Sequence, residues 1–132
     1  MTPIIRQSVT LPASPGALFK TFLDSNLHTA MTGMPAKTSA KASAKWSAFG
    51  GAIWGRNLLI VPGKLIVQTW RSTHFPKDAP DSILILAFSG TGKSGRIDLV
   101  HVNVARKDHK GVREGWPKFY WKPWRKYLSG KR

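Results

Sequence analysis

The feature of this sequence that most limits its fold is an aromatic-rich stretch near the C-terminus, GVREGWPKFYWKPWRKYL, residues 111–128. Large apolar side chains recur there at three- and four-residue spacing, which predicts a long amphipathic helix with one aromatic face. These side chains are Val112, Trp116, Phe119, Tyr120, Trp124, Tyr127 and Leu128. We expect Pro117 to be tolerated in the first turn of this helix, and Pro123 to kink it or to begin a second segment.

The rest of the sequence consists of strand patterns and turn signals, with one pair of short helices near the N-terminus. Apolar and β-branched residues in partial alternation predict a first strand over residues 4–11. Ser14 is a suitable helix cap and Pro15 suits the first helical position, so a helix should begin there, followed by a short one that stops at Gly33. Further strands are expected over residues 53–61, 65–71, 83–88 and 95–104. This order predicts a single α+β domain over residues 1–132, built on an antiparallel meander.

One stretch, AKTSAKASAKWSAFGG at residues 36–51, allows more than one interpretation. Its composition resembles a basic tail that wraps DNA. A helix would stack Lys37, Lys41 and Lys45 on one face, which is mildly unfavourable for like charges. A strand would instead place lysines and serines on one face and the alanines with Trp46 on the other. Although alanine is a poor strand former, the alternation favours a strand that forms part of a folded wall.

The charge balance is unusual, because 21 Lys and Arg residues face only 6 Asp and Glu residues, giving a net charge of +15. Such a charge makes nucleic acid or an acidic protein surface candidate partners. The sequence has no Cys, which excludes disulfides, thiolate zinc sites and thiol nucleophiles. No apolar run is long enough for a signal peptide or a membrane span, so we expect a cytoplasmic chain without a membrane partner.

Motifs that would carry catalysis or bind a cofactor are weak. Residues 87–94, AFSGTGKS, resemble a phosphate-binding loop, but a strand follows instead of a helix, so we expect a hairpin turn. The four histidines lack metal-ligand spacing, and no carboxylate pair or nucleophile elbow is present. We therefore expect a non-enzymatic chain with no cofactor, no metal and no catalytic residues. His101 is in phase with Ile97 and Leu99, so it is either a buried structural histidine or the acid–base group of a cavity enzyme.

Four segments together resemble a known family. They are SVTLPASPGALFKTFLD, HTAMTG, WSAFGGAIWGRNLLIVPGKLIVQTWR and EGWPKFYWKPWRKYL. Their most specific parts are the F-x-x-F helix after LPASP, the FGG-I-G-N strand pair, IVQ-W-R and the GW that opens the last helix. The chain resembles, over about residues 4–128, the activators of the heat-shock protein 90 ATPase in their C-terminal-domain form. That family belongs to the START-like, or SRPBCC, superfamily.

The resemblance implies a helix-grip (START/Bet v-like) fold. In this fold a curved antiparallel sheet of about six or seven strands wraps a long C-terminal helix, two short helices follow the first strand, and a cavity lies between sheet and helix. The resemblance also implies binding of a small hydrophobic ligand in that cavity, and of a chaperone-type protein partner. Either a monomer or a homodimer fits it.

The aromatic residues give the candidate binding site. With a helix-grip cavity, the expected lining residues are Trp46, Trp54, Trp70, His101, Trp116, Phe119 and Tyr120. These side chains could equally fill the core, and the two interpretations stay open. Aromatics interleaved with Lys and Arg are also typical of single-strand nucleic-acid binding, but a helical stripe of aromatics is explained more simply as core. The predicted function is a non-enzymatic START-like domain with an apolar cavity; a basic nucleic-acid-associated protein and a cavity enzyme are the alternatives.

Overall fold

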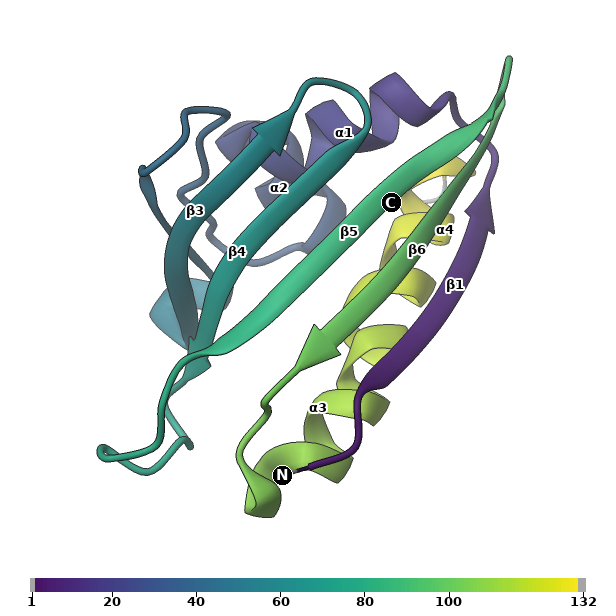
Figure 1. The fold of residues 1–132 in the computed structure, drawn as a ribbon. Helices are drawn as coiled ribbons and strands as arrows, with labels where there is room; N and C mark the ends of the chain where they lie inside the picture. The colour runs from purple at the N-terminus through teal and green to yellow at the C-terminus, as the bar shows by residue number, and fades with distance from the viewer. Residues whose placement is uncertain (1, 131–132) are drawn as a thin grey trace.

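The computed structural model describes residues 2–130, which form a curved antiparallel sheet with the helices on one side of it (Figure 1). The sheet has six strands: β1 (Ile5–Leu11), β2 (Lys45–Ala48), β3 (Ile53–Val61), β4 (Leu65–Ser72), β5 (Ser82–Thr91) and β6 (Ser94–Val102). Their order across the sheet is β1-β6-β5-β4-β3-β2. Two short helices, α1 (Pro15–Leu23) and α2 (Ser25–Thr32), follow β1. The architecture confirms the predicted α+β helix-grip fold.

The short helices begin where the sequence indicates. The Ser14 hydroxyl accepts a hydrogen bond from the Ala17 amide at 3.1 Å, and Pro15 occupies the first helical position of α1. Asp24 ends α1 and caps α2 by accepting from the Leu27 amide at 3.0 Å. Gly33 closes α2 in the left-handed conformation, with φ of 81°. Residues 87–94 form the β5–β6 hairpin, as expected from the strand that follows them.

The C-terminal helix is one continuous unit with a widened turn in its middle. A short 3-10 turn, η2 (Arg106–Asp108), leads into α3 (His109–Trp116), then a π-helical turn, η3 (Pro117–Trp121), and α4 (Lys122–Leu128). The expectation that Pro117 lies in the first turn was wrong, because α3 precedes it. The widened turn ends at Trp121, and the Lys122 amide that follows donates to the Pro117 carbonyl five residues earlier. Pro123 lies in the first turn of α4, so a second helical segment begins there, which is one of the two outcomes expected for this proline.

The strand expected across the basic stretch at residues 36–51 is mostly absent. Only β2 and an isolated bridge between Lys37 and Ser47 join the sheet there. Ala40 and Ala42 are exposed, and Ser43 has a left-handed backbone with φ of 68°, so these residues form a loop. Trp46 keeps the predicted inward position and is buried, as are Ala36 and Ala48 near the two ends of the stretch. Poor strand propensity of alanine outweighed the alternation here.

A buried asparagine holds this loop against the sheet. Asn57 lies on the inner face of β3, and its side-chain amide donates to the Ser39 and Lys41 carbonyls at 2.9 Å each. Its side-chain oxygen accepts from Gln68 on β4, also at 2.9 Å. Backbone bonds from Ser43 to Asn57 and from Asn57 to Ala44 complete the attachment. The loop is thus a fixed part of the fold because one buried side chain satisfies its inward-facing carbonyls.

The core fills the space between the inner face of the sheet and the helices. Inward residues of the central strands, such as Ile66, Leu84, Leu86 and Leu99, are almost completely buried. Trp124 of α4 is fully buried among them, stacked with its ring centroid 6.4 Å from that of Phe22 in α1. Much of the aromatic face of the C-terminal helix is therefore packed core.

Candidate functional site

His28 joins α2 to the C-terminal helix through a buried hydrogen-bond chain. Its Nδ1–H donates to the Phe22 carbonyl at 2.7 Å, because a carbonyl can only accept. The Nε2 atom is then free to accept from the Tyr120 hydroxyl at 2.8 Å. Burial lowers the pKa of His28 and raises the pKa of Tyr120, so both groups are neutral. The pair fixes the position of Tyr120 on the helix.

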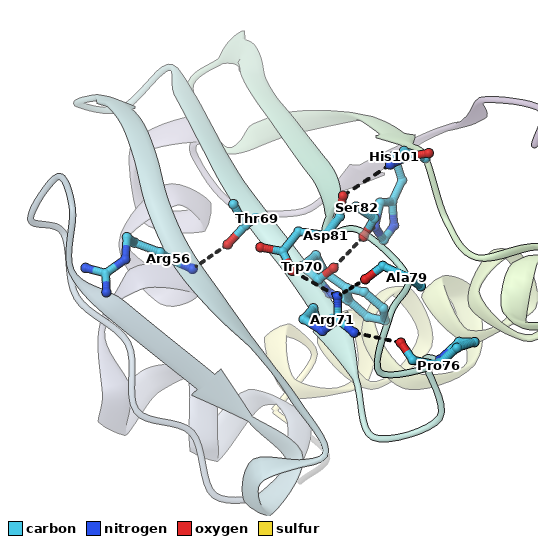
Figure 2. Close-up of polar contacts among 10 residues, drawn as sticks. Arg56, Thr69, Trp70, Arg71, Pro76, Ala79, Asp81, Ser82 and His101 are labelled. Atoms are coloured by element: carbon cyan, nitrogen blue, oxygen red, sulfur yellow. Dashed lines mark hydrogen bonds and ion pairs between the residues drawn. The ribbon is translucent and has the colours of Figure 1, made fainter. Parts of the chain in front are cut away.

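His101 connects β6 to the C-terminal helix in the same manner. The Trp116 indole N–H donates to His101 Nδ1 at 3.2 Å, which leaves the ring proton on Nε2. Nε2–H donates to the Ser82 hydroxyl at 2.9 Å, and that hydroxyl donates to the Trp70 carbonyl at 2.6 Å (Figure 2). Burial, with a smaller effect from the charge of His109, lowers the pKa of His101 to about 3. Both ring nitrogens are engaged, which is the arrangement of a structural histidine.

Gln7 on β1 makes a third polar connection to this helix. Its side-chain oxygen accepts from the Trp121 indole at 2.8 Å, and its amide nitrogen donates to the Arg113 carbonyl at 2.8 Å. In a regular helix that carbonyl would accept from residue 117, but Pro117 has no N–H. Gln7 therefore replaces the hydrogen bond that the proline removes. We refer to Gln7, His28 and His101 as the three helix clasps.

A pocket of about 520 Å³ opens between the sheet and the first half of the C-terminal helix. Trp70, Trp116 and Tyr120 form its inner, buried wall. Its apolar rim comes from segments far apart in the sequence and includes Met34, Phe49, Ile53, Val112 and Phe119. Its polar rim consists of Ser72, His74, Lys107 and Asp108. Because several rim residues are exposed, the pocket is open to solvent on this side.

Two features of the helix and the β2–β3 turn shape this pocket. Gly111 and Gly115 line it from α3, and a Cβ added at Gly111 would meet no atom within 4 Å. Phe49, in the turn η1 (Phe49–Gly51), packs edge-on against Tyr120 and Phe119, with ring centroids 5.4 and 5.9 Å away. The glycines leave space on one side of the pocket, and the three aromatic rings form a wall on the other.

The structure separates the seven sequence candidates into two groups. Trp70, Trp116, Phe119 and Tyr120 line the pocket. His101 lies outside the lining, packed between Trp70 and Trp116 with ring centroids 4.8 and 5.9 Å away. The remaining two are tryptophans on the strands β2 and β3.

Neither of these tryptophans reaches the pocket. Trp46 is buried over β3, where its indole donates to the Thr69 carbonyl at 3.2 Å. This contact requires Gly55, since a Cβ there would overlap the Thr69 carbonyl oxygen and lie 2.8 Å from the Trp46 indole nitrogen. Trp54 pairs with Arg71 on the outer face of the sheet and is 38% exposed.

Sequence reasoning missed several pocket residues, and two of them, Phe49 and His74, lie in turns. Phe49 and His74 have no periodic pattern around them. The FGG turn was the available signal for Phe49, since Gly50 and Gly51 both have left-handed φ angles of 66° and 95°. Arg71 orders the loop that follows His74 by donating to the Pro76 and Ala79 carbonyls and pairing with Asp81 at 3.0 Å (Figure 2).

The positive charge is spread over the outer side of the C-terminal helix and the edges of the sheet. Exposed bases on the helix are Lys110, Arg113, Lys118, Lys122, Arg125 and Lys126. Within residues 2–130 the ion pairs are Arg71–Asp81, Arg96–Asp98 and a long Arg113–Glu114 contact of 3.9 Å. Most bases therefore have no acidic partner in this part of the chain. The described residues also contain no group of His, Asp and Glu placed to hold a metal ion, and no helix long and apolar enough to span a membrane.

Two curated relatives of this chain come from a slime mould and from human. "Activator of 90 kDa heat shock protein ATPase homolog" from Dictyostelium discoideum is 28% identical over 116 residues, covering 87% of this chain and 30% of the relative. "Activator of 90 kDa heat shock protein ATPase homolog 1" from Homo sapiens is 25% identical over 111 residues, covering 84% of this chain and 32% of the relative. The chain thus spans about a third of the length of these relatives.

Solved structures show the same fold at low sequence identity. An HSP90 activator from Plasmodium falciparum has a TM-score of 0.85 at 21% identity, with 98% of this chain and 97% of that chain covered. The solution structure of the Aha1 dimer from Colwellia psychrerythraea has a TM-score of 0.74 at 11% identity, with 89% and 90% covered. The family model described as "Activator of Hsp90 ATPase homolog 1-like protein" matches residues 12–129. The chain belongs to this family of Hsp90 ATPase activator homologues and has its START-like, helix-grip fold.

Proposed function

We propose that this chain is a non-enzymatic START-like domain that binds a protein partner of the chaperone type. The observation that carries the proposal is the family match over residues 12–129, whose curated relatives are named as activators of a 90-kDa heat-shock protein ATPase. The chain corresponds to about a third of the length of those relatives. The proposal therefore covers binding of the partner protein and does not extend to stimulation of its ATPase. The many bases without acidic partners support an acidic surface on the partner.

A direct binding measurement tests this proposal. The purified chain is titrated into a purified 90-kDa heat-shock protein by isothermal calorimetry at low and at physiological salt. We expect saturable binding at both, weaker at the higher salt because exposed charges contribute. Heat that vanishes at physiological salt would contradict the proposal and indicate only polycation association. Single-stranded DNA of matched charge, titrated in parallel, tests the nucleic-acid alternative, which requires tight binding with a steep dependence on salt.

We propose as a second function that the pocket holds a small hydrophobic molecule. Its volume of about 520 Å³ and its aromatic wall support this, since ligand pockets are commonly apolar and roughly 300–1,000 Å³ in size. A Gly111→Leu variant would fill the space without meeting a neighbouring atom at Cβ. We expect it to abolish the fluorescence of an apolar dye that the parent chain binds, while Gly16→Leu, in the open on α1, retains it. Equal dye binding by both variants would contradict the assignment of this pocket.

A further inference from the structure

The outer face of the sheet carries an apolar band. The register places Leu59, Val67, Ile85 and Val100 directly opposite one another on β3, β4, β5 and β6. Val61 and Leu65 form the start of a neighbouring row. We call these six residues the outer band. Leu59 is 49% exposed and Val61 37%, and the other four are half-buried.

Nothing in the described chain covers this band. The helices of residues 2–130 all pack on the opposite side of the sheet (Figure 1). An antiparallel sheet with one open face normally alternates apolar residues inward with polar residues outward. Here the middle of the sheet is apolar on both faces, because the row from Leu59 to Val100 points outward. A contiguous apolar patch on a sheet face of this kind is a feature of binding surfaces.

Basic residues surround the outer band. Arg6 on β1 lies opposite Val100, at the end of the row that runs from Leu59 to Val100. Lys64 lies in the turn between β3 and β4. Lys45 and Arg56 stand directly opposite each other on β2 and β3, and both are exposed. Like charges in this position repel each other unless an acidic group lies nearby.

The acids beside the band are already paired. Asp98 binds Arg96 at 3.0 Å, and Asp81 binds Arg71 at 3.0 Å. The charge left unpaired at this face is therefore positive. A second copy of the chain would bring another net charge of +15 against it, which opposes self-association through this face.

We propose that the outer band is the docking surface for an acidic, amphipathic segment of a partner protein. The apolar side of that segment packs on Leu59, Val67 and Ile85, and its carboxylates reach Arg6, Lys64 and the Lys45–Arg56 pair. This inference rests on the proposed function, that the chain binds a protein partner, and assigns the surface used. The pocket lies on the helix side of the sheet, so it stays accessible while the band is occupied.

Two synthetic helical peptides test the assignment without requiring that the partner be known. Both carry leucines on one face, and the other face carries glutamates in one peptide and lysines in its control. In NMR spectra of the 15N-labelled chain, we expect the glutamate peptide to shift amide signals of β3 to β6 around Leu59, Val67 and Ile85. The lysine peptide should leave them unchanged. Equal binding of both peptides, or shifts confined to the C-terminal helix, would overturn the proposal.

Point variants separate apolar packing from charge. Leu59→Ser and Arg6→Glu should each weaken binding of the glutamate peptide about tenfold, whereas the conservative Leu59→Met should keep it. Lys122→Glu, an equal charge reversal on the C-terminal helix, should change it by less than about twofold. Melting temperatures close to that of the parent chain confirm that each variant is folded. A Lys122→Glu effect as large as that of Arg6→Glu would show general charge attraction and refute the assignment.

The same variants with the 90-kDa heat-shock protein distinguish the two proposals. If the chaperone binds the parent chain but not Leu59→Ser, both are supported. If it binds the parent, Leu59→Ser and Arg6→Glu equally, the proposed function stands and the outer band is wrong. If it does not bind the parent while the glutamate peptide docks on the band, the proposed function fails and the band remains. Binding of anionic vesicles or single-stranded DNA through Leu59, without peptide binding, would overturn the protein docking site.

Discussion

Acidification should destabilise the fold through its two buried histidines. His101 is held neutral in the native state, with a pKa lowered to about 3, while a histidine in the unfolded chain has a pKa near 6.5. Below about pH 6.5 the unfolded state therefore binds more protons than the native state, and the free energy of unfolding falls as the pH falls. Each pH unit costs about 1.36 kcal/mol, so His101 alone should remove ~2.7 kcal/mol at about pH 4.5. His28, whose pKa is also lowered by burial, adds to this loss.

The assay is urea unfolding at about pH 8 and about pH 4.5, followed by tryptophan fluorescence. Other groups also titrate over this range, so the difference between variants carries the test. His101→Asn keeps a donor and an acceptor near Ser82 and Trp116 but cannot titrate. We expect its loss of stability on acidification to be smaller than that of the parent by ~2.7 kcal/mol. His74→Asn, the same substitution at an exposed histidine, serves as the matched control.

One result would refute the reasoning directly. If the parent and His101→Asn lose the same stability between the two pH values, then His101 does not stay neutral in the native state. The Trp116–His101–Ser82 chain would then be arranged differently. Should His101→Asn fail to fold, the NMR titration of the His101 ring in the parent chain gives the same answer. A ring that protonates between about pH 5 and 7, in the folded protein, contradicts the predicted depression of the pKa.

Three further substitutions test the packing that shapes the fold. Gly55→Ala should destabilise the chain by roughly 1–3 kcal/mol in chemical denaturation, because the new methyl overlaps the Thr69 carbonyl, whereas Gly16→Ala should not destabilise it. Asn57→Ala should cost about 2–4 kcal/mol and increase hydrogen exchange in the loop before β2, since two backbone carbonyls lose their donor; unchanged exchange would contradict its anchoring role. Gln7→Leu should cost about 1–3 kcal/mol, measured by urea unfolding, because it leaves an indole N–H and a helix carbonyl unpaired; a neutral result would show that water replaces both bonds.

Much of the fold could be predicted because local patterns agree with the tertiary structure. The Ser14 cap, the Pro15 start and the Gly33 stop act within a few residues, and each lies where the sequence placed it. The aromatic spacing located the C-terminal helix but not its beginning, because η2 and the first turns of α3 are largely polar. The loop before β2 was wrongly predicted as a strand because its lysines and alanines alternate as they do in a strand. Its conformation is held by the side chain of Asn57, which lies on β3 and is distant in the sequence.

The candidate site was harder to predict because its contacts join distant parts of the chain. His28 and Tyr120 are 92 residues apart, and no local pattern indicates that they meet. Only the pairing of residues between strands shows that Trp54 lies on the outer face of the sheet and that Trp46 lies opposite Gly55. The inward phase of His101 was visible in the sequence, but the indole that fixes its ring belongs to the helix, 15 residues later.

The three helix clasps also affect the order in which parts of the chain can fold during synthesis. Gln7 must wait for Trp121, 114 residues further along, and His28 must wait for Tyr120. During synthesis all six strands are therefore made before the C-terminal helix, so the part of the inner face that this helix covers stays exposed, with only α1 and α2 in place. A chain stopped before residue 116 would expose the apolar inner residues that the C-terminal helix covers and would lack the partners of Gln7 and His28. We therefore expect the fold to close only once the C-terminal helix has been synthesised and can pack on the sheet.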